Sequence, residues 1–205
     1  MLNIAVFVSG RGSNLGAILN SIPNYLNNVE VVAVVSNVPD CPAIELAKGN
    51  GIPTYAVAKV EKEGFISYSQ LLPFLSKLNV GLVVLAGFLK KIPDEFIEAF
   101  ENKIINIHPA LLPSFGGKGM YGLNVHKEVY NGSCQVSGAT VHFVNKFYDD
   151  GKIIAQRCID ISNVKSPEEI ASRVLEIEHR LLPYVIKKFS EGKIKINENR
   201  VFISE

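Results

Sequence analysis

Short apolar runs alternate with amphipathic stretches along the first half of the chain. Strand-like runs occupy residues 3–8, 30–36, 53–57, 82–86 and 103–107. Helical patterns lie between them, around 15–19, 42–48 and 65–78 and after Pro93, and we expect Pro73 to disturb the third helix. Apolar strands that do not alternate, separated by helices, are typical of a parallel sheet covered on both faces.

The pattern changes after Pro109. A Gly-rich loop runs to Gly122, and two longer strands, 136–144 and 153–161, predict an antiparallel hairpin around Asp149-Asp150-Gly151. Ser166-Pro-Glu-Glu169 predicts the capped start of a long helix, which we expect Pro183 to kink or divide. Residues 193–203 predict a small terminal hairpin. The predicted fold class is α/β: an open, mostly parallel, Rossmann-like sheet with helices on both faces and an added antiparallel C-terminal portion.

Composition narrows the classes of function. The length of 205 residues predicts one domain. The 21 basic and 20 acidic residues are mixed along the sequence, which predicts that the protein binds no nucleic acid. Every apolar run is too short to cross a membrane, and the N-terminal strand has no basic flank of a signal peptide. The three cysteines are odd in number and widely spaced, which disfavours disulfides and metal knuckles. We expect a cytoplasmic protein.

The first strand ends in a glycine turn, Ser9-Gly-Arg-Gly-Ser-Asn-Leu15. Such a turn lets the backbone approach a ligand, and the start of the next helix attracts anions, so Gly12, Ser13 and Asn14 are candidates for binding a phosphate. The turn lacks the third glycine of a dinucleotide fingerprint and the lysine of a Walker motif. The alternative is a turn that only joins strand to helix, capped by Ser13 or Asn14.

Two polar residues lie at the end of the fifth apolar run. Asn106 and His108 are two positions apart, so their side chains share one face of the strand, at the edge of an α/β sheet where ligands gather. Asp149 is a candidate carboxylate partner for His108, and the alternative is an ordinary turn residue. For His126, His142 and His179 a structural role is favoured. The histidine spacing matches no zinc site, so no metal is expected.

The order and spacing of four motifs resemble those of the glycinamide ribonucleotide transformylase (phosphoribosylglycinamide formyltransferase) family over nearly the whole chain. The motifs are the glycine turn, Leu85-Ala-Gly-Phe-Leu-Lys-Lys91, Asn106-Ile-His-Pro-Ala-Leu-Leu-Pro113, and Gly138-Ala-Thr-Val-His-Phe-Val144 with Asp149. The resemblance implies a single formyltransferase domain over 1–205, with a nucleotide-binding half (1–108) and a folate-closing half (109–205). It implies an enzyme of purine biosynthesis that uses 10-formyltetrahydrofolate as co-substrate and 5'-phosphoribosylglycinamide as substrate.

The resemblance also implies residue roles. Asn106, His108 and Asp149 would be catalytic, Gly12, Ser13 and Asn14 would hold the substrate phosphate, and Glu178 would contact the glycinamide end. The expected folate-binding residues are Leu85, Phe88, Leu89, Lys90, Lys91, Ile92, Asn106, Asn145, Lys146, Phe147 and Tyr148. Lys90 stands where many relatives have arginine, Leu175 replaces a glutamine that some relatives use, and the loop 115–122 is longer than in the shortest relatives.

Rival functions share parts of these motifs. A formyltetrahydrofolate deformylase would share the folate half, and a sugar-nucleotide formyltransferase would also use an Asn-His-Asp set. A methionyl-tRNA formyltransferase would need a further C-terminal domain, and a deformylase would usually carry a domain before the first strand, so we expect neither here. A non-catalytic nucleotide-binding domain would explain the glycine turn but would leave Asn106 and His108 without a purpose.

Overall fold

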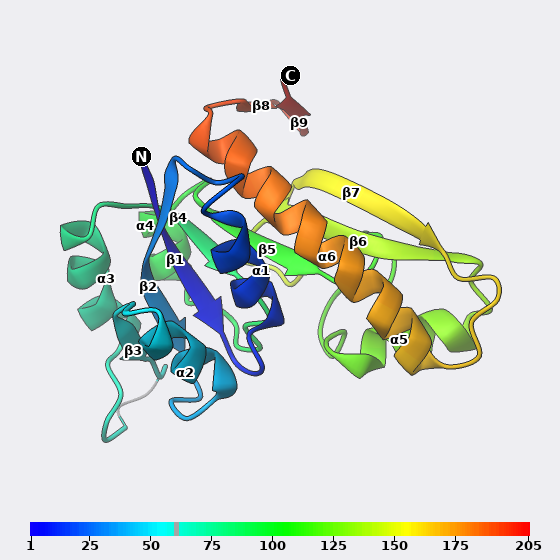
Figure 1. Ribbon diagram of the computed structural model, residues 1–205, viewed down its shortest axis with the longest axis horizontal. Helices are drawn as coiled ribbons and strands as arrows, with labels where there is room; N and C mark the ends of the chain where they lie inside the picture. The colour runs from blue at the N-terminus through cyan, green and yellow to red at the C-terminus, as the bar shows by residue number, and fades with distance from the viewer. Residues whose placement is uncertain (60–61) are drawn as a thin grey trace. The chain divides into compact units, whose positions relative to one another are not determined.

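The larger sheet has seven strands in the order β3-β2-β1-β4-β5-β6-β7 (Figure 1). The computed structural model describes residues 1–59 and 62–205. Its contacts divide the chain into two compact units, Met1–Ile105 and Asn106–Glu205. A separate antiparallel pair, β8-β9, follows at the C-terminus. The predicted class, a mostly parallel α/β sheet with an antiparallel C-terminal portion, is confirmed.

The first unit is built from parallel strands joined by helices. β1 pairs in parallel with both β2 and β4, and β2 pairs in parallel with β3. The residues from Ile4 to Val8 of β1 are fully buried, which explains why this run is apolar without alternation. The elements are β1 (Leu2–Val8), α1 (Ser13–Ser21), β2 (Val29–Ser36), α2 (Pro42–Gly49), β3 (Thr54–Ala56), α3 (Tyr68–Lys77), β4 (Val80–Leu85) and α4 (Asp94–Ala99).

The third helix of this unit corrects one prediction. α3 runs from Tyr68 to Lys77 with Pro73 inside it. Its start is fixed by a capping box, because the Ser67 hydroxyl accepts a hydrogen bond from the Gln70 backbone and the Gln70 side chain accepts one from the Ser67 backbone. Leu71 and Leu75, on either side of the proline, are fully buried. Burial of this face outweighs the backbone hydrogen bond that proline removes.

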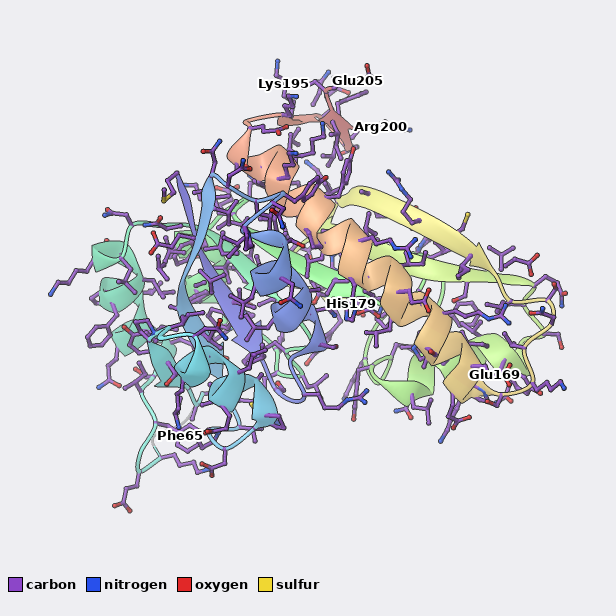
Figure 2. The ribbon with its side chains drawn as sticks, in the orientation of Figure 1. Phe65, Glu169, His179, Lys195, Arg200 and Glu205 are labelled. Atoms are coloured by element: carbon purple, nitrogen blue, oxygen red, sulfur yellow. The ribbon has the colours of Figure 1, made fainter. Side chains whose placement is uncertain are left out.

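The second unit begins within β5, at Asn106. β6 and β7 pair antiparallel, as predicted, and α6 packs on both of them and on α5 (Figure 1). Figure 2 shows Lys195 and Arg200 on the terminal hairpin and Glu169 near the start of α6. The elements are β5 (Ile104–His108), α5 (Leu123–Asn131), β6 (Val136–Phe143), β7 (Ile153–Asp160), α6 (Pro167–Ser190), β8 (Ile194–Asn197) and β9 (Arg200–Ile203).

Pro183 does not divide α6, which is one helix of 24 residues. Val174, Leu181 and Val185 form a buried apolar stripe on both sides of the proline, so packing holds the helix together. The predicted cap forms in part. The Ser166 hydroxyl accepts from the Glu169 backbone, but the Glu169 carboxylate accepts from the backbone of Lys165 instead of Ser166.

The sequence reading missed α5. This helix begins directly after Gly122 and ends before Gly132. Val125 and Val129, four residues apart, are buried, and His126 is buried beside them. The apolar spacing was present in the sequence, but the glycine-rich loop before it and the strand after it left only nine helical residues, a length at which the pattern is weak.

Candidate active site

Asn106 and His108 lie at the carboxyl end of β5, as the spacing predicted. β5 is apolar at its other positions, and Ile104 and Ile105 are buried. His108 is also buried, with 3% of its surface exposed, whereas Asn106 is half-buried. A strand that is otherwise apolar therefore delivers an amide and an imidazole to one place.

Asp149 reaches His108 from the turn after β6. An Oδ2 to Nδ1 distance of 3.6 Å separates the two side chains, and both are largely buried. The carboxylate is held by the backbone N–H of Gly117, which donates to Oδ2 at 2.9 Å. Asp149 has a positive φ of 52°, a conformation that an aspartate tolerates better than most residues. The structure thus brings together the three residues that the sequence singled out.

The loop that follows β5 contacts both His108 and Asp149. The Nε2 atom of His108 lies 2.8 Å from the carbonyl oxygen of Phe115, so this nitrogen carries a proton and donates it. Phe115 has a positive φ of 57°. Gly116 packs so closely on Leu112 and Asp149 that a Cβ there would lie 3.2 Å from the Asp149 Cβ. Sequence reasoning did not find these backbone contacts, because no side-chain pattern encodes them.

A fourth polar side chain, that of His142, completes the cluster. Its Nε2 lies 3.1 Å from the Asn106 Nδ2 and 3.7 Å from the Asp149 Oδ1. Burial lowers the pKa of His142 below its usual value. For this residue the sequence favoured a structural role. The available signal was its position in β6, where it shares a buried face with Thr140 in an otherwise apolar strand.

His126 of α5 is electrostatically linked to the cluster. Burial, and next the nearby His108, lower the pKa of His126 to about 4. Its Nδ1 is buried without a hydrogen-bond partner among the described residues. His126 is therefore neutral at physiological pH, and it places no positive charge beside His108.

The four side chains form a set suited to acyl transfer. An amide and an imidazole can both donate hydrogen bonds to a developing oxyanion, and a carboxylate can accept or order a proton. Low exposure strengthens each of these interactions, because the local dielectric constant is lower than that of water. None of the four is a nucleophile of the serine or cysteine type.

The glycine turn of the first unit adopts the expected strand-to-helix geometry. Gly12 is the N-cap of α1 with a φ of 78°, and its carbonyl accepts from the Gly16 N–H at 2.8 Å. A Cβ on Gly12 would lie 2.6 Å from that of Ala43, so only glycine fits. The alternative cap by Ser13 or Asn14 is wrong, because both residues lie inside the helix.

Ser9 joins this turn to the candidate folate segment within the same unit. Its hydroxyl accepts a hydrogen bond from the Leu89 backbone at 2.9 Å and donates to the Asn37 side chain. Residues 85–92 combine buried and exposed side chains. Leu85, Phe88 and Ile92 are buried, whereas Leu89, Lys90 and Lys91 are exposed.

The remaining candidates lie in the second unit. The loop 145–148 is shaped by Asn145, whose side chain donates to Asp150 and accepts from the Phe147 backbone. The aromatic ring of Phe147 is 72% exposed and that of Tyr148 is 49% exposed, so the loop presents apolar surface to solvent beside Asp149. Glu178, on α6, is buried.

In the described ranges 1–59 and 62–205, no group of three His, Cys, Asp or Glu residues is arranged to hold a metal ion. No helix in the described part of the chain combines the length and apolarity needed to span a bilayer.

Comparison with known proteins gives the class. Residues 2–186 match the family described as formyl transferase, so the chain belongs to this family. The phosphoribosylglycinamide formyltransferase of Haemophilus influenzae is 33% identical over 99% of this chain and 94% of its own length. The chloroplastic enzyme of the same name from Arabidopsis thaliana is 46% identical over 97% of this chain and 68% of its length. The crystal structure of the Anaplasma phagocytophilum enzyme superposes with a TM-score of 0.88 at 33% identity, covering 100% of this chain and 95% of that one.

These matches confirm the resemblance drawn from the four motifs, and with it the prediction of an enzyme that transfers a formyl group.

Proposed function

We propose that this enzyme transfers the formyl group of 10-formyltetrahydrofolate to the amine of 5'-phosphoribosylglycinamide, a step of de novo purine biosynthesis. The observation that carries the proposal is the cluster of the buried His108 with the partly buried Asn106 and Asp149. The names of relatives that match nearly the whole chain support phosphoribosylglycinamide as the acceptor of a formyl group.

In the proposed reaction the neutral amine attacks the formyl carbon. Negative charge then develops on the formyl oxygen, and the Asn106 amide and the His108 imidazole each donate a hydrogen bond to it. This attack forms the new C–N bond, and collapse of the tetrahedral intermediate then breaks the bond from carbon to N10 of the folate. One proton leaves the attacking amine and one reaches N10, so the folate departs as tetrahydrofolate.

The contacts of His108 add a requirement to this mechanism. Its Nε2–H already donates to the Phe115 carbonyl, and its Nδ1 faces Asp149. The formyl oxygen must therefore share or replace the Phe115 carbonyl as the acceptor at Nε2. Asp149 meanwhile offers a negative charge to the other side of the ring and an acceptor for a water that takes the amine proton.

Binding is assigned to three groups of residues in this proposal. Gly12, Ser13 and Asn14 hold the phosphate of the ribonucleotide, and Glu178 contacts the glycinamide end. Residues Leu85 and 88–92 line the folate site, and Asn145, Lys146, Phe147 and Tyr148 close over the pterin. Holding amine and formyl donor in contact supplies a large part of the rate acceleration through orientation.

The proposal also covers location and partners. Two small molecules are the partners, with no metal, nucleic acid or membrane, and the location is the cytoplasm. The support comes from the balanced charge and from three free cysteines, Cys41, Cys134 and Cys158.

The test is a spectroscopic assay for loss of 10-formyltetrahydrofolate, with and without the ribonucleotide. Consumption that requires the ribonucleotide supports the proposal. Equal consumption without it would identify a deformylase. Consumption only with an amino-sugar nucleotide would identify a sugar formyltransferase, and no consumption with any acceptor would leave a binding domain.

A further inference from the structure

His142 occupies a special position on β6. The pairing between β6 and β7 shifts register between Val141 and His142, so that Val141 faces Ala155 but His142 faces Ile153. A bulge of this kind changes the direction of a side chain and is common beside active sites. His142 is 2% exposed, and it lies between the Phe143 carbonyl on one side and Asn106 on the other.

The first of these contacts fixes the tautomer of the ring. The His142 Nδ1 lies 2.7 Å from the Phe143 carbonyl oxygen, which can only accept. Nδ1 therefore carries a proton, and in the neutral ring Nε2 is left with a lone pair. Gly151 leaves room for this carbonyl, because a Cβ at that position would clash with the Phe143 oxygen.

The lone pair on Nε2 selects one orientation of the Asn106 amide. With Nδ2 toward the ring, at 3.1 Å, the amide donates to Nε2. With the amide reversed, the Oδ1 lone pairs would oppose the Nε2 lone pair at the same distance. We propose that His142 is a positioning residue, which holds Asn106 so that its second Nδ2–H, and not its Oδ1, is offered to the formyl oxygen.

The surroundings of His142 keep its ring neutral. Burial, and to a smaller extent His108, lower the pKa of His142. The Phe143 carbonyl and the Asp149 carboxylate raise it, but the net effect is a lowered pKa. Protonation would place an N–H on Nε2 and would draw the Oδ1 of Asn106 toward the ring instead. The geometry therefore works only with the neutral imidazole.

The rest of the Asn106 side chain is available for substrate. Among the described residues it makes no side-chain hydrogen bond other than the one to His142, and it is half-buried. A side chain anchored at one hydrogen and open at the other is a preorganised donor. This inference rests on the proposed function, because it assigns Asn106 the role of donor to the formyl oxygen.

The test compares variants at one position. His142→Phe keeps a ring but removes the acceptor, and we expect kcat to fall at least about tenfold with little change in either KM, since loss of a complete oxyanion donor costs about 10²–10³-fold. His142→Gln restores an acceptor oxygen and should recover part of kcat. Val141→Ala is the packing control, because Val141 is fully buried on the opposite face of β6, and its kcat should stay within about twofold of the wild type.

A double-mutant cycle separates positioning from general damage. If His142 acts through Asn106, then His142→Phe lowers kcat less than about twofold when Asn106 is already alanine. Losses that multiply would overturn the inference, and so would equal kcat values for His142→Phe and the wild type.

If the His142→Phe variant does not fold, NMR spectroscopy of the wild type tests the inference instead. In the 15N-labelled wild type without ligands, His142 Nε2 should show the shift of an unprotonated nitrogen and a scalar coupling across the hydrogen bond from the Asn106 amide. A protonated Nε2 would sink the inference. This measurement needs no turnover, so it tests the positioning role of His142 independently of the proposed function. The proposed function would fail separately, if the wild type transferred no formyl group to the ribonucleotide.

Discussion

The glycine turn of the first unit and the polar cluster of the second unit are built in different ways. The turn is shaped by its backbone, since Gly12 has a positive φ and no room for a side chain. The cluster is made of side chains, the buried His108 and His142 and the partly buried Asn106 and Asp149, which are linked at 3.1–3.7 Å. Changes to the turn should therefore alter binding and stability, whereas changes to the cluster should alter turnover.

The largest effect is expected in the cluster. His108→Ala and Asp149→Asn should each lower kcat by about 10²–10⁴-fold while changing either KM only a few-fold, because each removes a group that acts mainly in the transition state. Steady-state kinetics with both substrates varied measure this. Asp160→Asn is the control, because the Asp160 carboxylate is exposed and accepts hydrogen bonds only from the backbone and hydroxyl of Ser162 among the described residues. Unchanged kcat with raised KM would assign His108 and Asp149 to binding.

The next effect concerns His126 and pH. Its pKa is about 4 in the folded protein, below the usual value near 6.5, so the unfolded chain takes up the proton first as pH falls. Stability from this group is complete above pH 6.5 and is lost toward pH 4, by about 2–3 kcal/mol. Urea unfolding at pH 7 and pH 4.5 should show a smaller loss for His126→Gln than for the wild type. Equal losses would exclude His126 as the source.

A smaller loss of stability is expected at the turn. Gly12→Ala should lower the free energy of unfolding by about 2 kcal/mol or more, from the positive φ and from the contact with Ala43. Gly10→Ala is the matched control, because nothing lies within 4 Å of a Cβ there. Chemical denaturation of both variants measures the difference. Equal stability would mean that the turn adapts to a side chain.

The smallest effect is on phosphate binding. Ser13→Ala combined with Asn14→Ala should raise the KM for the ribonucleotide about tenfold and leave kcat and the folate KM nearly unchanged, because the helix N-terminus and its backbone N–H groups remain. An unchanged ribonucleotide KM would remove these two side chains from the phosphate site.

The same contrast explains what the sequence could predict. Asn106 and His108 stood out because two polar residues interrupt an apolar strand, and Gly12 because its turn joins a strand to a helix. His142 did not stand out, because a single histidine in a strand carries no sign of its partners Asn106 and Asp149, which lie elsewhere in the sequence. The contacts of the Phe115 carbonyl and the Gly117 N–H depend on tertiary folding of a loop.

The two prolines inside helices show that the sequence can also predict a disruption that the folded chain does not have. Pro73 and Pro183 each remove one backbone hydrogen bond, which is a local effect that sequence reasoning can see. The buried faces of α3 and α6 outweigh it, and that packing exists only in the folded chain.

The fate of the formyl carbon tests the central claim most directly. With 10-formyltetrahydrofolate labelled with 13C at the formyl group, carbon NMR should show the label moving into an amide of the ribonucleotide, one for each folate consumed. Label released as formate, in the presence of the ribonucleotide, would contradict the claim that this cluster directs the formyl group to an amine.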